Sequence, residues 1–133
     1  MEGRLPLTLS AKAGTGLTAG GAAFKFVKWA SEGVVVLCDA ATDVPCGVVQ
    51  ETPAAEGDAV LVVAVGITKV QAAAGAPAAN DPIGTDANGQ AAVYAVTDTT
   101  VYSVGRVISA DGITAAGGLI TAAVNCAAPA RFA

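Results

Sequence analysis

From residue 22 onward, short apolar runs alternate with turn-forming residues at a spacing of about 8–12 residues, as in small all-β proteins. The runs are rich in Val, Ile and Thr, which favour strands, and Gly, Pro, Asn and Asp separate them. No stretch has the 3.6-residue period and the capping residues of a long helix. The pattern therefore predicts an all-β fold, a small β-barrel or sandwich of about 7–9 short strands. The expected strands are residues 24–29, 34–38, 44–50, 59–65, 67–70, 90–96, 100–108 and 119–124.

Turn signals divide the second half of the chain. Asn88-Gly89 predicts a β-hairpin with a type I′ turn, in which both central residues have positive φ. Asp81-Pro82 predicts another turn. We expect Gly66 to interrupt the apolar run that begins at Ala59.

Two segments repeat one pattern, residues 45–61 and residues 103–121. Each has a glycine inside a strand, then a polar loop with Ala-Ala, then a second glycine before an apolar strand. Such glycines permit a bulge or a close approach of backbones. Two copies are too few for a solenoid, so the pattern predicts pseudo-symmetric halves of a small barrel.

The beginning of the chain has little to bury, because residues 10–16 are mostly small and polar. We expect an extended N-terminal arm over residues 1–21, with a plain disordered terminus as the alternative. A single β-domain should follow over residues 22–126, and residues 127–133 should form a C-terminal tail. Residues 1–31 carry four cations and one acid, whereas residues 32–133 carry three cations and ten acids.

The overall composition narrows the classes of partner. A net charge of −4 and an isoelectric point near 4.5 argue against nucleic acid. No apolar run approaches the roughly 20 residues of a membrane helix, and the first residues do not form a secretion signal. The chain is nevertheless 53% hydrophobic with a mean hydropathy of +0.59. That excess suggests apolar surface covered by neighbours in an oligomer or on a lattice.

The inventory of reactive side chains predicts a protein that is not an enzyme. The chain has no His, which removes a histidine triad and histidine-ligated metals. Cys38, Cys46 and Cys126 lack CxxC spacing, so we expect no metal site and no cofactor. Two alternatives stay open for them, a Cys38–Cys46 bridge across a hairpin or three small buried thiols in a reducing cytoplasm.

Trp29 also has two interpretations. Trp is enriched at the centres of interfaces, so the side chain could anchor a partner. We favour the other interpretation, in which this one large residue fills an Ala- and Val-rich core.

Several short phrases of the chain, taken in order, resemble the small capsid decoration (cement) proteins of tailed bacteriophages. The phrases are residues 26–28, 33–35, 40–48, 55–60, 65–70, 84–91, 104–105 and 115–120. The resemblance implies a compact β-domain, often a homotrimer with an N-terminal arm, that binds the outside of the expanded capsid and stabilises it. The chain departs from the family in its longer arm and in Cys46, where the family commonly has Ile.

The implied partner is the major capsid protein, and the implied location is the capsid surface of a virion assembled in the host cytoplasm. The resemblance supplies no catalytic residue and no cofactor. From the charge distribution we expect Arg4, Lys12, Lys25 and Lys28 to contact an acidic capsid surface. The alternative function is a fibre- or adhesin-like module that binds host-surface glycan, although such sites usually need exposed aromatic side chains.

Overall fold

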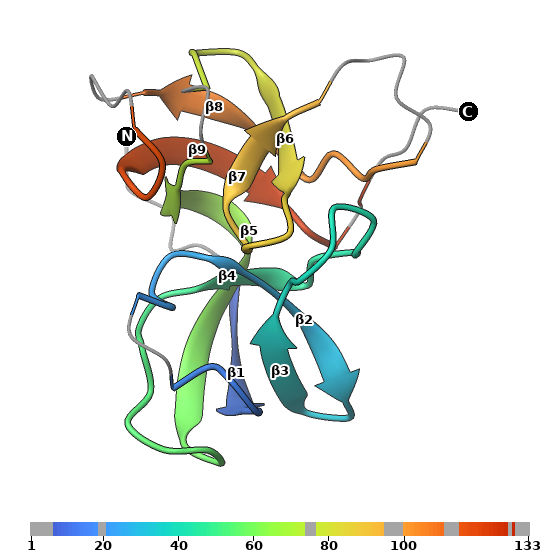
Figure 1. The fold of residues 1–133 in the computed structure, drawn as a ribbon, viewed down its shortest axis with the longest axis vertical. Helices are drawn as coiled ribbons and strands as arrows, with labels where there is room; N and C mark the ends of the chain where they lie inside the picture. The colour runs from blue at the N-terminus through green and yellow to red at the C-terminus, as the bar shows by residue number, and fades with distance from the viewer. Residues whose placement is uncertain are drawn as a thin grey trace.

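The computed structural model of the chain describes residues 7–18, 21–73, 77–94, 100–110, 115–127 and 129. Within this part of the chain there is no helix, and nine strands form one continuous sheet (Figure 1). The all-β prediction is therefore confirmed. The strands are β1 (Leu7–Ala13), β2 (Phe26–Ser31), β3 (Val34–Leu37), β4 (Gly47–Val49), β5 (Ala59–Gln71), β6 (Pro82–Thr85), β7 (Ala91–Val93), β8 (Gly105–Ser109) and β9 (Leu119–Asn125).

The first five strands close into a barrel. Their order is β1-β3-β2-β4-β5, and β1 also pairs antiparallel with the first half of β5, which completes the ring. Only the β1–β3 pair is parallel, with Lys12 opposite Val34. Small and β-branched side chains fill this barrel, and Leu17 from the loop after β1 is fully buried among them.

The long strand β5 links this barrel to the rest of the molecule. Past Gly66 it continues without a break and pairs antiparallel with β9 along the segment from Val65 to Gln71. The sheet then proceeds through β8 and β6 to β7. A single bridge between Ala72 and Ala91 brings the end of β5 back beside β7, so the second set of strands is also drawn into a ring. Figure 1 shows β5 running from the lower ring into the upper one.

The two rings have the same topology, and we call them repeat 1 (residues 7–65) and repeat 2 (residues 66–125). In repeat 1 the hairpin β2–β3 is followed by β4, which pairs with β2, and then by β5, which pairs with β4. In repeat 2 the hairpin β6–β7 is followed in the same way by β8, which pairs with β6, and then by β9, which pairs with β8. The second half of β5 takes in repeat 2 the place that β1 has in repeat 1.

Backbone hydrogen bonds confirm the equivalence residue by residue. The amide of Gly57 donates to the carbonyl of Ala13, and the amide of Gly117 donates to the carbonyl of Ala72, both at 2.8 Å. The predicted pseudo-symmetric halves are thus present, with the difference that each half forms its own ring of strands. Equivalent residues even share unusual backbone angles, since Phe24 has φ of 66° and Asn80 has φ of 74°.

The repeats pack through the wall of the first barrel. Side chains on the outer face of β2, β4 and β5 are Phe26, Val48 and Val63, and all three are buried in one cluster with the interior residues of repeat 2. Their neighbours in sequence face into the first barrel instead. One apolar core therefore fills repeat 2 and joins it to repeat 1.

The prediction of an arm over residues 1–21 is wrong for the described residues 7–18. Strand β1 is part of the first barrel, and the small side chains of Ala11 and Ala13 are buried in it. Small residues fit here because a narrow ring leaves little interior volume. Residues 1–6 lie outside the described residues, as does most of the expected tail at 127–133.

Three local predictions need correction. Pro82 begins strand β6 rather than a turn, and the first position of a strand tolerates proline because no ladder donor is lost there. The hairpin at Asn88-Gly89 is present, but only Gly89 has positive φ, so its turn is not type I′. Trp29 is 48% exposed and does not fill the core, where Phe26 is the largest fully buried side chain.

Candidate functional site

Of the four cations expected to contact the capsid, the three that the structure describes do not form one cluster. Lys12 is exposed on β1 and Lys28 lies on β2, with β3 between these strands. Lys25 lies against Gly89 in the turn between β6 and β7. Arg4 is outside the described residues. A contact of these residues with a capsid stays a prediction.

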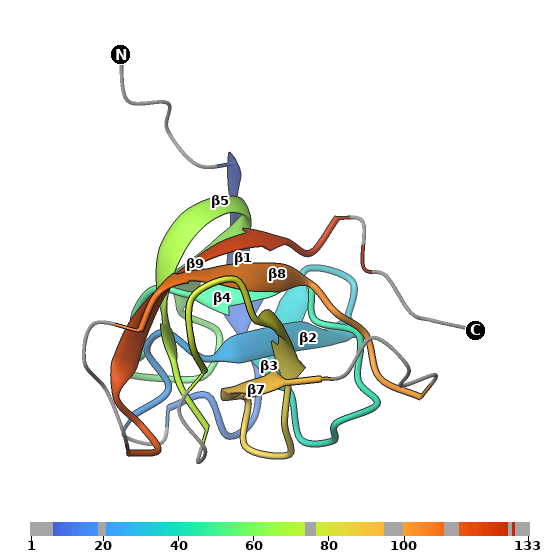
Figure 2. The ribbon, with the colours of Figure 1, turned by 90° about the horizontal axis from the view of Figure 1, so that it is seen from above.

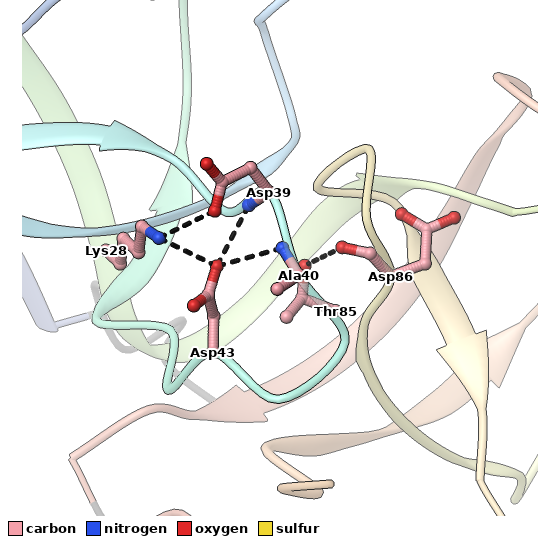
Figure 3. A network of polar contacts seen from close by, with 6 residues as sticks. All are labelled: Lys28, Asp39, Ala40, Asp43, Thr85 and Asp86. Atoms are coloured by element: carbon pink, nitrogen blue, oxygen red, sulfur yellow. Dashed lines mark hydrogen bonds and ion pairs between the residues drawn. The ribbon is translucent and has the colours of Figure 1, made fainter.

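Lys28 is held in a polar network with the loop that follows β3 (Figure 3). Its ammonium group lies 2.7 Å from Asp39 Oδ1 and 2.9 Å from Asp43 Oδ2. The same Asp43 oxygen accepts hydrogen bonds from the amides of Asp39 and Ala40, at 2.9 and 3.0 Å. Bonds to Asp39 and Asp43 hold the pKa of Lys28 above its ordinary value. The network closes the loop against β2, which is a structural role.

Asp43 is the centre of this network. Burial raises the pKa of its carboxyl, but hydrogen bonds from Lys28 and from two backbone amides outweigh this effect and leave the pKa below its ordinary value. A carboxyl with a lowered pKa stabilises the fold above its unfolded-state pKa, near 3.9, and loses this contribution as the pH falls through the folded-state value.

We therefore expect Asp43→Asn to lower the free energy of unfolding by about 1–2 kcal/mol near pH 7, since a charge-assisted bond is lost. The difference from the unsubstituted protein should shrink as the pH falls below about 4. Urea denaturation at several pH values measures both effects. A difference that persists unchanged at pH 2.5 would mean that the carboxylate charge is not what stabilises the loop.

All three cysteines are free thiols, and the Cys38–Cys46 bridge is not formed. Burial raises the pKa of Cys38 and of Cys126 to about 12, and that of Cys46 to about 11. These thiols are protonated at neutral pH, which makes them poor nucleophiles and poor metal ligands. They act as small apolar side chains in the core.

Within the described residues, no group of three or more Cys, Asp or Glu is arranged to hold a metal ion. Nor does the described part of the chain contain a helix long and apolar enough to cross a membrane.

The exposed sheet face on repeat 2 was not predicted from the sequence. Burial alternates along the second half of β5 and along β9 and β8, so every second side chain there points outward. The register places Ile67, Ala123 and Arg106 in one row across the three strands, and Lys69 beside Thr121 in the next. We call this surface the β5–β9–β8 outer face. In Figure 2 the three strands lie side by side.

Apolar side chains are prominent on the β5–β9–β8 outer face. Ile67 is 63% exposed, and Ile108 and Leu119 are also exposed. Ile108 lies at a register shift between β8 and β9, and its side chain faces outward by the alternation with buried Val107. Only the strand register brings these residues together, which is why separate apolar positions in the sequence did not reveal the face.

No family model and no curated protein matches the chain. Among solved structures, it is similar to the head fiber gp8.5 N base of bacteriophage phi29, with a TM-score of 0.62. The chain shares its fold with the base of a phage head fibre. The match covers 92% of this chain and 96% of that one, so it includes both repeats, at 15% sequence identity.

Proposed function

We propose that this chain is a structural protein of a bacteriophage virion that binds the outer surface of the capsid and stabilises the expanded lattice. The observation that carries the proposal is the fold shared, over nearly the whole of both chains, with the base of a phage head fibre. The ordered sequence phrases that resemble capsid decoration proteins support the same function. In this proposal the partner is the major capsid protein, and the chain acts without catalysing a reaction.

The architecture is compatible with a protein that stabilises a capsid by binding to its surface. Two rings of strands share one strand, and the core of repeat 2 packs on the outer face of repeat 1, so the described domain should move as a rigid body. A rigid protein loses little conformational entropy when it binds. Many copies that each bind weakly can together stabilise the capsid lattice. We further propose that the chain is a homotrimer located on the capsid surface and assembled there in the host cytoplasm.

The test is to mix the purified protein with expanded capsids that lack it. We expect saturable binding with a fixed ratio to the major capsid protein, and a capsid disruption temperature that rises by several degrees because ligands of the intact state stabilise it. Cryo-electron microscopy of the decorated particle then identifies the lattice position. Unassembled capsid subunits serve as the control. Absence of binding, or equal binding to free subunits, would contradict the proposal.

A glycan-binding module of a fibre is the second candidate, because the structural neighbour is part of a head fibre and because Trp29 is half exposed. Sugar rings commonly stack on such aromatic side chains. A glycan array that shows one competable ligand, lost in Trp29→Ala, would favour this function over capsid decoration. An array without such a ligand would eliminate it.

A further inference from the structure

The β5–β9–β8 outer face is the counterpart of a buried surface in repeat 1. By the strand registers, Arg106 of β8 corresponds to Val48 of β4, and Ala123 of β9 corresponds to Val63 of β5. Val48 is fully buried and Val63 is 3% exposed, because repeat 2 covers them. The same face is thus an interface in repeat 1 and open in repeat 2.

An end repeat in a soluble array normally carries a polar outer face. Repeat 2 follows this rule in part, because Arg106 replaces the valine and donates a hydrogen bond to the carbonyl of Asn80 at 2.8 Å. The rule fails at Ile67, which is more exposed than Leu61, the other exposed large apolar residue of β5, and stands in the same row as Arg106. Exposed apolar side chains beside cations are typical of the centre and rim of a binding surface.

Charge indicates the chemistry of the partner. The protein carries a net charge of −4, yet none of the residues of β5, β8 and β9 is acidic. The charged side chains of the face are Lys69 and Arg106. Lys69 donates to Thr121 Oγ1 at 2.8 Å, which holds its ammonium group over the sheet. A complementary surface would be apolar at its centre and would carry carboxylates opposite the two cations.

We propose that the β5–β9–β8 outer face is the surface that docks on the capsid, against an apolar patch of the capsid protein flanked by Asp or Glu side chains. This inference rests on the proposed function and specifies its contact. It replaces the cations of residues 1–31 as the principal contact, since Lys12 and Lys28 lie on repeat 1 and Lys25 lies at the β6–β7 turn.

The experiment compares Ile67→Asp and Arg106→Glu with Leu61→Asp in binding to expanded, undecorated capsids. Leu61 is the matched control, because it is an exposed apolar residue of the same strand but lies on repeat 1, where it corresponds to Thr121. Urea denaturation establishes that each variant is folded. We expect at least tenfold weaker binding for both face variants and unchanged binding for the control. The effect of Arg106→Glu should diminish as the salt concentration rises from about 50 to about 500 mM, because salt screens the interaction between exposed charges.

The outcomes separate the two proposals. If the unsubstituted protein binds capsids and the face variants bind equally well, the assignment of the face is wrong while the proposed function stands. If the unsubstituted protein does not bind, the proposed function itself fails. If the face variants instead convert an oligomer of the free protein to monomers in sedimentation and bind capsids normally, the face joins copies of this chain, which also overturns the docking proposal.

Discussion

Replacing Phe26 with alanine is expected to lower the free energy of unfolding by about 3–5 kcal/mol, the cost of emptying a large buried site. The side chain is fully buried in the core that joins the repeats. Its amide donates a hydrogen bond to the carbonyl of Gly89 in repeat 2 at 2.7 Å, so the backbone also fixes Phe26 at the boundary between the two repeats. A cavity here would remove contacts from both repeats at once. Urea denaturation followed by circular dichroism measures the change.

Trp29→Ala is the matched control for this prediction. It removes a larger side chain from the same strand, but one that is 48% exposed, so the loss should be about 1 kcal/mol. If Phe26→Ala does not fold, Phe26→Leu should still report a loss of about 1–1.5 kcal/mol. Equal losses for Phe26→Ala and Trp29→Ala would show that the boundary between the repeats contributes no more than the rim of the barrel.

Periodicity predicted the strands whose side chains alternate between core and solvent. The segment 119–124 is such a case, and β9 is found at Leu119–Asn125. β1 was missed because its buried residues are Ala11 and Ala13, and alanine is depleted in strands. β6 was missed because its first residue, Pro82, is also a turn residue.

The interruption expected at Gly66 did not occur, because that glycine adopts a φ of 139° within the ladder. The strand passes through it and enters repeat 2. Gly66 therefore does mark the boundary between the repeats, but the strand continues through it. Which strand joins two rings is decided by pairings that are distant in sequence.

The candidate surface could not be predicted for a related reason. Charge counts identified cations in residues 1–31, but counts do not place side chains on a common face. Lys28 lies between two carboxylates, whereas Arg106 shares a row with Ile67. The register that creates this row is a property of the folded sheet and appears nowhere in the linear sequence.

The repeated glycines are the part of the sequence pattern that the structure explains most fully, and they give the second large prediction. A Cβ atom on Gly47 would collide with Val62 and lie 2.7 Å from the carbonyl oxygen of Val63. A Cβ atom on Gly105 would collide with the carbonyl oxygen of Ala123 and lie 3.1 Å from Cα of Val124. Both glycines occupy the same position in their repeats, where the paired neighbouring strand approaches closely.

Gly47→Ala and Gly105→Ala should each lower the free energy of unfolding by about 3 kcal/mol, because the obstacle is a neighbouring strand that cannot move without breaking its ladder. Gly57→Ala is the control. Its φ of 87° strains an alanine, but nothing lies within 4 Å of the added carbon, so the cost should be about 1 kcal/mol. Urea denaturation of the three variants tests the difference. If Gly57→Ala proves as damaging as the other two, the close approach of neighbouring strands at Gly47 and Gly105 costs no more than the strain of a positive φ at Gly57.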